Sequence, residues 1–144
     1  MASGGLMQKL KQLIKWPLVF LLILIPGAPL FMKWMALRKA REHVGQEAPD
    51  TSSVDSGQDT PRKVFYFHAP YCGPCKAMMP MSSQLQQEYP GLIKVDATQN
   101  PELAQAFGVS ATPTFVITDV NRVTEVRIGA CGEGWLRKRL ANPD

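Results

Sequence analysis

Cysteine and histidine are scarce in this chain, whose 144 residues include three cysteines and two histidines. Three cysteines are too few for the dense disulfide framework that stabilises small secreted domains. Only one C-x-x-C pair occurs, and no second such pair or H-x-H pair accompanies it. Reactive or metal-binding cysteines are therefore the better starting hypothesis, although a zinc site would need two further ligands at suitable spacing.

Charged residues are also few, at 19% of the chain, and the formal net charge is +4. A nucleic-acid-binding domain normally carries a concentrated basic face. From Arg62 to Asp144 the chain has nine basic and seven acidic residues, so this part is nearly neutral. Much of the excess flanks one apolar block near the N-terminus: Lys9, Lys11, Lys15, Lys33, Arg38, Lys39 and Arg41. The pattern indicates a membrane surface and no nucleic-acid partner.

The apolar block, residues 16–32, has no charged residue at all. A membrane-spanning helix needs ~20 apolar residues, with ~17 near the lower limit. Trp16 and Trp34 stand where interfacial aromatic residues are expected. We predict a basic N-terminal segment over residues 1–15 and one transmembrane helix over residues 16–37. The alternatives are a cleaved signal peptide and a buried or hairpin helix broken by the prolines within the block.

Apolar residues are rare in the segment that follows. From Glu42 to Pro61 there are five acidic residues, no lysine or arginine, and no helix or strand period. Such a segment cannot bury enough apolar surface to offset the entropy of ordering. We therefore predict a polar flexible linker over residues 38–61 and one small folded domain over residues 62–144.

The domain over residues 62–144 alternates strand and helix patterns. Val64 to Phe67 is a continuous apolar run, as in a strand that is buried on both faces. The expected strands cover residues 64–67, 92–96, 114–118 and 123–128, and the expected helices begin at residue 72, cover residues 101–107 and begin at residue 135. The order β-α-β-α-β-β-α predicts an α/β fold with a mixed central sheet and flanking helices.

The C-x-x-C pair reads Cys72-Gly73-Pro74-Cys75 and stands at the start of a predicted helix. A thiolate attacks disulfides, and a free cysteine with a pKa of ~8.5 is mostly protonated at neutral pH. The unpaired N–H groups and the dipole at a helix N-terminus favour the anion of Cys72. Cys75, about one helical turn deeper, is placed to displace whatever Cys72 has bound. Gly73 and Pro74 allow a close turn and keep the spacing rigid.

A metal site is the alternative interpretation of the same pair. It would need further ligands, and Cys131 and His68 are the candidates. Cys131 has two interpretations of its own: a small, buried apolar side chain, or a third redox thiol that exchanges with Cys72 or Cys75. The residue types and their spacing leave both questions open.

Several motifs in register resemble the thioredoxin family over a little more than half of the chain. They are the C-G-P-C of residues 72–75, Pro80 in the following helix, Val95-Asp96, Asn100-Pro101-Glu102-Leu103, Ala111-Thr112-Pro113-Thr114 and Gly129-Ala130. The resemblance implies a minimal thioredoxin-like fold in which Pro113 is a cis-proline close to the two cysteines. It also implies that substrate is bound by Tyr71, Thr112, Pro113, Gly129 and Ala130.

The chain departs from the family pattern in four places. The family's buried aspartate corresponds to Tyr66, and the lysine that usually lies near it corresponds to Leu92. Tyr71 stands where the family usually has tryptophan. Nothing between Arg41 and Arg62 reads as the family's first strand and helix. Proton transfer at the second cysteine is therefore expected to differ from that of typical members.

The sequence thus predicts a membrane-anchored thiol–disulfide oxidoreductase that reduces disulfides in protein substrates. Cys72 attacks, Cys75 resolves, a separate thiol donor restores the pair, and neither a further cofactor nor a metal is needed. A metal-delivery module using Cys72, Cys75 and Cys131, or a non-catalytic anchored adaptor, are the alternatives. Basic residues flank residues 16–32 almost evenly. We favour an extracytoplasmic domain, periplasmic if the host is a bacterium, with the cytoplasmic side left open.

Overall fold

The computed structural model describes residues 31, 34–35, 37–38, 41–55 and 60–141. The chain forms two compact units, residues 1–35 and residues 36–144. In the first unit, Phe31, Trp34 and Met35 are helical and exposed, and the first two rings stack with centroids 6.3 Å apart. The predicted segment 1–15 and most of the predicted membrane helix 16–37 lie outside the described residues. Within the described residues, no helix is long and apolar enough to cross a membrane.

The second unit contains the strands and helices in the predicted order, β-α-β-α-β-β-α. The elements are β1 (Arg62–His68), α2 (Gly73–Glu88), β2 (Leu92–Asp96), α3 (Pro101–Ala106), β3 (Thr114–Asp119), β4 (Arg122–Ile128) and α4 (Glu133–Ala141). The sequence prediction of a thioredoxin-like α/β arrangement with a mixed sheet is confirmed.

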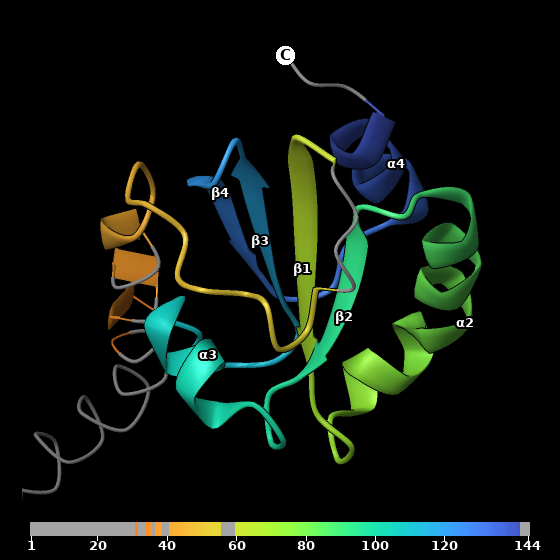
Figure 1. Ribbon diagram of the computed structural model, residues 1–144. Coiled ribbons are helices and arrows are strands. Elements are labelled where there is room, and N and C mark those ends of the chain that lie inside the picture. The colour runs from red at the N-terminus through yellow and green to blue at the C-terminus, as the bar shows by residue number, and fades with distance from the viewer. Residues whose placement is uncertain (1–30, 32–33, 36, 39–40, 56–59, 142–144) are drawn as a thin grey trace, which may run out of the picture. The chain divides into compact units, whose positions relative to one another are not determined.

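The four strands form one sheet in the order β2-β1-β3-β4. β1 runs parallel to β2 and antiparallel to β3, and β3 is antiparallel to β4. The end of β1 therefore meets the beginning of β3, where Phe67 lies opposite Thr114. This topology brings the segments that precede α2 and β3 to one end of the sheet, at the bottom of Figure 1.

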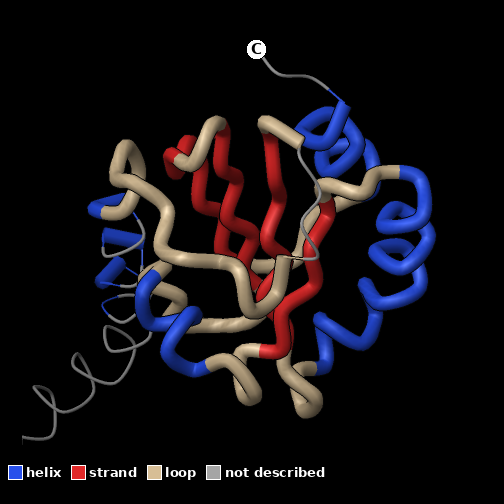
Figure 2. Tube along the Cα trace, viewed as in Figure 1, coloured by secondary structure: helices blue, strands red, loops and turns tan. Residues whose placement is uncertain are grey.

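Helices cover both faces of the sheet, as Figures 1 and 2 show. Side chains alternate along a strand, so successive residues of the fully buried run Val64–Phe67 enter opposite layers. One core cluster joins Phe65 and Phe67 to α3, and the other joins Val64 and Tyr66 to α2 and α4. The prediction that this strand is buried on both faces is confirmed.

Helix α2 buries one face against the second cluster. Its buried residues are Cys75, Met78, Ser82 and Leu85, a spacing of three and four that places them on one side of the helix. Because Cys75 begins this buried row, the packing that holds α2 on the sheet also fixes the inner cysteine.

Part of the predicted linker is bound to the edge of the sheet. The Gly45 N–H donates a 2.7 Å hydrogen bond to the Val123 carbonyl, and the Val123 N–H donates a 2.9 Å bond back to Gln46. The Ala48 N–H donates to the carbonyl of Asn121 over 2.7 Å. We call Gly45 to Ala48 the strap. It lies beside β4, at the edge opposite β2.

The strap also contributes to packing, because Ala48 and Val54 lie against the core cluster that contains α3. The description of residues 38–61 as a flexible linker is therefore wrong for the strap and for Val54. The sequence pattern did not predict this, since the main-chain hydrogen bonds of the strap go to backbone groups beside β4, which any residue type offers.

Candidate active site

Cys72 and Cys75 form a disulfide at the N-terminal end of α2. The two sulfurs are 2.05 Å apart and the two Cα atoms 5.2 Å apart. Cys72 is half-buried, whereas the side chain and backbone of Cys75 together are 1% exposed. The pair thus has an outer sulfur that reagents can reach and an inner sulfur that the sheet protects, as the spacing predicted.

Cys72 is also the N-cap residue of α2. Its sulfur accepts a 3.2 Å hydrogen bond from the Cys75 N–H, and its carbonyl accepts the first helical bond from Lys76. An N-cap acceptor satisfies an N–H that has no partner within the helix. When the disulfide is reduced, the same N–H and the positive end of the helix dipole stabilise negative charge on the Cys72 sulfur.

The loop before β3 contains the cis peptide bond between Thr112 and Pro113 that the family resemblance implied. Pro113 is buried and Thr112 is half-buried. The Pro113 carbonyl accepts a 2.7 Å hydrogen bond from the Gly129 N–H. Gly129 has a φ of +99°, a conformation that favours glycine. This bond joins the cis-proline loop to the segment that follows β4.

Two of the expected substrate-contacting residues are exposed to solvent. Tyr71, immediately before the outer cysteine, is 96% exposed, and Ala130, immediately after Gly129, is also exposed. An exposed aromatic ring beside a reactive sulfur offers an apolar contact surface to an incoming chain. Its role in binding belongs to the proposal below.

Tyr66 lies beneath the disulfide, inside the core. It is 0% exposed, and its hydroxyl donates a 3.3 Å hydrogen bond to the Cys75 carbonyl. Burial raises the pKa of Tyr66, and the nearby Cys131 raises it further. The family resemblance identified Tyr66 as a replacement for the usual aspartate. It did not predict this hydrogen bond, because the bond forms only when α2 packs on β1.

The strand register shows which residue lies beside Tyr66. Leu92 pairs with Val64, and Lys94 pairs with Tyr66. The Lys94 ammonium group donates a 3.0 Å hydrogen bond to the Ser83 hydroxyl. A lysine of this chain therefore lies next to Tyr66 in the sheet, two residues after Leu92, which the sequence reasoning did not predict.

Cys131 is a free, half-buried thiol. It packs against the cluster that contains Tyr66, and burial raises the pKa of Cys131 to about 11, against the opposite effect of Arg127. A protonated thiol is a poor nucleophile and a poor metal ligand. Within the described part of the chain, no three histidine, cysteine or acidic residues are grouped to hold a metal ion. The metal-site alternative is therefore not favoured.

The comparison with known families decides the identity of this arrangement. Residues 52–142 match the thioredoxin family model. The chain belongs to the thioredoxin family. Together with the Cys72–Cys75 disulfide, this membership makes the protein a thiol–disulfide oxidoreductase.

Curated thioredoxins are similar in sequence to this family member. Thioredoxin 1 of a Nostoc species is 31% identical over 77 residues, which is 51% of this chain and 72% of that protein. The thioredoxin of Chlorobaculum thiosulfatiphilum is 29% identical over 98 residues, which is 65% of this chain and 91% of that protein.

Solved thioredoxin structures share the fold. Mitochondrial thioredoxin 3 of Saccharomyces cerevisiae, in its oxidized form, is 28% identical with a TM-score of 0.53. The superposition covers 72% of this chain and 97% of the yeast chain. The thioredoxin NaTrxh of Nicotiana alata is 32% identical with a TM-score of 0.52, covering 62% of this chain and 76% of that one.

Two arginines and two aromatic rings meet around Trp135 in α4, and the sequence reasoning missed this cluster. The Trp135 ring lies 4.8 Å from the Arg127 guanidinium carbon and 5.3 Å from that of Arg139, and it meets the Phe115 ring edge-on. Arg139 also pairs with Glu125 at 2.6 Å. The alternation of side chains along β4 could have predicted that Arg127 and Glu125 lie on the same face of the sheet. Their contacts with α4 could not be predicted, because they form only when α4 packs on that face.

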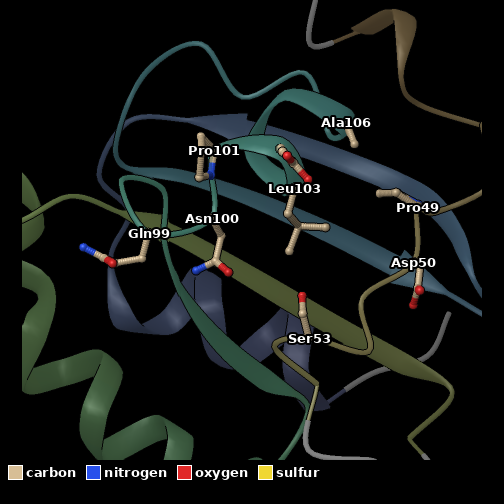
Figure 3. A pocket seen from close by; sticks show the side chains of 9 residues that line it. Pro49, Asp50, Ser53, Gln99, Asn100, Pro101, Leu103 and Ala106 are labelled. Atoms are coloured by element: carbon tan, nitrogen blue, oxygen red, sulfur yellow. The ribbon is translucent and has the colours of Figure 1, made fainter.

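A pocket of about 490 Å³ lies elsewhere, between the segment after the strap and α3. Figure 3 shows Asp50 and Ser53 on one side, and Asn100, Pro101 and Leu103 on the other. None of its lining residues belongs to the C-G-P-C motif, to the cis-proline loop or to residues 129–131. The Cys72–Cys75 disulfide is therefore not part of this pocket.

Proposed function

We propose that this member of the thioredoxin family reduces disulfides in protein substrates. The observation that supports the proposal is the unequal burial of the two sulfurs, because Cys72 is half-buried at the helix end and Cys75 is enclosed beneath it. A large substrate can approach the first sulfur, and only the second sulfur of the same chain can then approach the mixed disulfide. The dithiol–disulfide pair is the whole redox centre, with no further cofactor or metal.

The reaction proceeds by two exchanges. The Cys72 thiolate attacks one sulfur of the substrate disulfide, the substrate bond breaks, and its other sulfur leaves as a thiolate that takes a proton. The Cys75 thiolate then attacks the Cys72 sulfur and releases the second substrate thiol. The substrate has gained two electrons, and the Cys72–Cys75 disulfide has formed. A separate thiol reductant returns two electrons to the pair.

The surface around Cys72 binds the substrate chain in this proposal. Tyr71 supplies an apolar contact, and the backbone of Thr112 pairs with an extended peptide, as in strand addition. Pro113, Gly129 and Ala130 shape the same surface. Gly73 and Pro74, both exposed in the first turn of α2, hold the two sulfurs at their spacing.

Insulin reduction tests the proposal. The full chain should accelerate the precipitation of insulin in dithiothreitol, and Cys72→Ser should abolish the acceleration. Cys131→Ser is the matched control, and it should retain activity because that thiol packs against the core and keeps its proton. An unaltered rate in Cys72→Ser would refute the proposal.

We further propose that residues 16–37 anchor the protein in a membrane, with the domain on the extracytoplasmic side. The support is the uncharged apolar run of residues 16–32 and its flanking tryptophans. The protein should stay with membranes after alkaline carbonate extraction. In intact cells, a membrane-impermeant maleimide should label the reduced Cys72. Labelling only after permeabilisation would place the domain in the cytoplasm.

A further inference from the structure

Tyr66 connects three parts of the molecule on which the disulfide depends. It lies in the middle of β1, and its hydroxyl donates to the Cys75 carbonyl over 3.3 Å. Its ring stacks on Phe115, with centroids 4.8 Å apart and planes inclined by 7°. Phe115 follows Pro113 by two residues. One buried side chain therefore joins the central strand, the first turn of α2 and the strand that leaves the cis-proline.

The Tyr66 hydroxyl acts as a hydrogen-bond donor and does not act as a base for the Cys75 thiol. Burial and the neighbouring Cys131 raise the pKa of Tyr66, and an ordinary tyrosine already ionises only near pH ~10. The hydroxyl consequently keeps its proton throughout the neutral range. It can hold the Cys75 carbonyl in place, but it cannot accept the proton that Cys75 must lose.

Within the described residues, Tyr66 has no hydrogen bond to a carboxylic acid, and Cys131 is the ionisable group that acts on its pKa. The ionisable groups that face it are His68 on the same strand, Lys94 across the β1–β2 ladder, Cys131 before α4, and Arg127 opposite Phe115. The nearest acid by register is Asp96, which lies opposite His68 and accepts hydrogen bonds from Thr98. In the part of the chain that the structure describes, no carboxylate is hydrogen-bonded to Tyr66 or Cys75, so none is in place to receive the Cys75 proton.

We propose that Tyr66 is a positioning residue for the resolving step, an inference that rests on the two-step exchange proposed above. In that step the Cys75 thiol gives its proton to solvent water. A bond then forms between the Cys75 and Cys72 sulfurs, and the bond between Cys72 and the substrate sulfur breaks. The rate depends on how closely the attacking sulfur approaches the line of the breaking bond. By holding the Cys75 carbonyl, Tyr66 limits how far Cys75 can drift while Cys72 carries the substrate.

The test separates the two steps in the reduced full chain. A chromogenic aromatic disulfide releases one coloured thiolate when Cys72 attacks it and a second when Cys75 resolves the mixed disulfide, so rapid mixing yields both rates. Tyr66→Phe keeps the ring and its stacking but removes the hydroxyl. The first rate should be unchanged, and the second should fall roughly two- to tenfold, the effect of one hydrogen bond.

The pH dependence distinguishes positioning from proton transfer. Because the phenol stays protonated, the ratio of wild-type to Tyr66→Phe resolving rates should be constant from about pH 6 to about pH 9. Tyr89→Phe is the matched control, since Tyr89 packs against the same cluster at the far end of α2. That control should leave both rates unchanged.

The other possible results contradict either the positioning role of Tyr66 or the exchange function. A ratio that varies with pH, equal slowing of both steps, or an unchanged resolving rate in Tyr66→Phe would overturn the positioning role. A wild-type chain that releases no coloured thiolate at all would overturn the exchange function itself. The two failures are therefore distinguishable in one experiment.

Discussion

The backbone N–H of Cys75 donates a hydrogen bond to the sulfur of Cys72 across 3.2 Å. In the reduced protein, the Cys75 amide can therefore stabilise the negative charge of the Cys72 thiolate. This effect does not require the Cys75 sulfur to react. The free Cys131 has the opposite environment, because burial in the core disfavours its ionised form.

Alkylation of the reduced protein should reflect this difference. With a pKa of about 11, Cys131 remains a thiol until the pH approaches that value, and at pH 8 about one molecule in a thousand carries the thiolate. Iodoacetamide should therefore modify Cys72 long before Cys131, as followed by peptide mass spectrometry. Equal rates at the two residues in the folded protein would contradict the assignment.

One side chain of α4 is completely enclosed by the core. Leu136 is fully buried and is the only buried residue of that helix. Leu136→Ala should lower the free energy of unfolding by about 2–5 kcal/mol, the usual effect of truncating an enclosed leucine. Urea denaturation measures this loss. Leu140→Ala, at a half-buried position on the same helix, is the comparison and should have a smaller effect.

The turn between β3 and β4 contains a strained residue. Val120 and Asn121 have φ values of +44° and +61°, and Val120 is 79% exposed. A β-branched residue is disfavoured in this left-handed region, where asparagine is better tolerated. Val120→Asn should raise the free energy of unfolding by about 1 kcal/mol.

The neighbouring position provides the converse experiment. Asn121→Val should lower the free energy of unfolding by a similar amount, about 1 kcal/mol. Chemical denaturation of both variants beside the wild type measures the pair. A stabilised Asn121→Val protein would show that the left-handed conformation is not retained in solution.

Hydrogen exchange should reveal whether the strap is formed in solution. Ala48→Pro removes the N–H that donates to the Asn121 carbonyl. The Val123 amide, which donates to Gln46 of the strap, should then exchange faster with deuterium. Glu47→Ala keeps every backbone donor and should leave the exchange at Val123 unchanged. Rapid exchange at Val123 in the wild type would contradict the contact.

The sequence was sufficient for features that depend on local pattern. The run Val64–Phe67 predicted an interior strand, because no other placement buries four successive large side chains. The spacing of Cys72 and Cys75 at a helix start predicted one exposed and one enclosed sulfur. The family motif around Pro113 predicted the cis bond, which no residue pattern alone could have supplied.

Features that depend on pairing between distant segments could not be predicted. Lys94 lies opposite Tyr66 because the two strands pair in a parallel register that the packing of both strands sets. The bond from Tyr66 to Cys75 likewise needs the helix to be docked. The strap is joined to β4 mainly by backbone hydrogen bonds, so its polar sequence gave no sign of order.

The strap also affects whether a shortened form of the domain stays monomeric. A sheet edge with unpaired N–H and C=O groups is a template on which another molecule can add a strand. Gly45 and Gln46 occupy the Val123 groups at this edge, so the protein shields itself from its own copies. A shortened chain that starts at residue 52, where the family match begins, would lose that shield and should self-associate at concentrations where the longer chain stays monomeric.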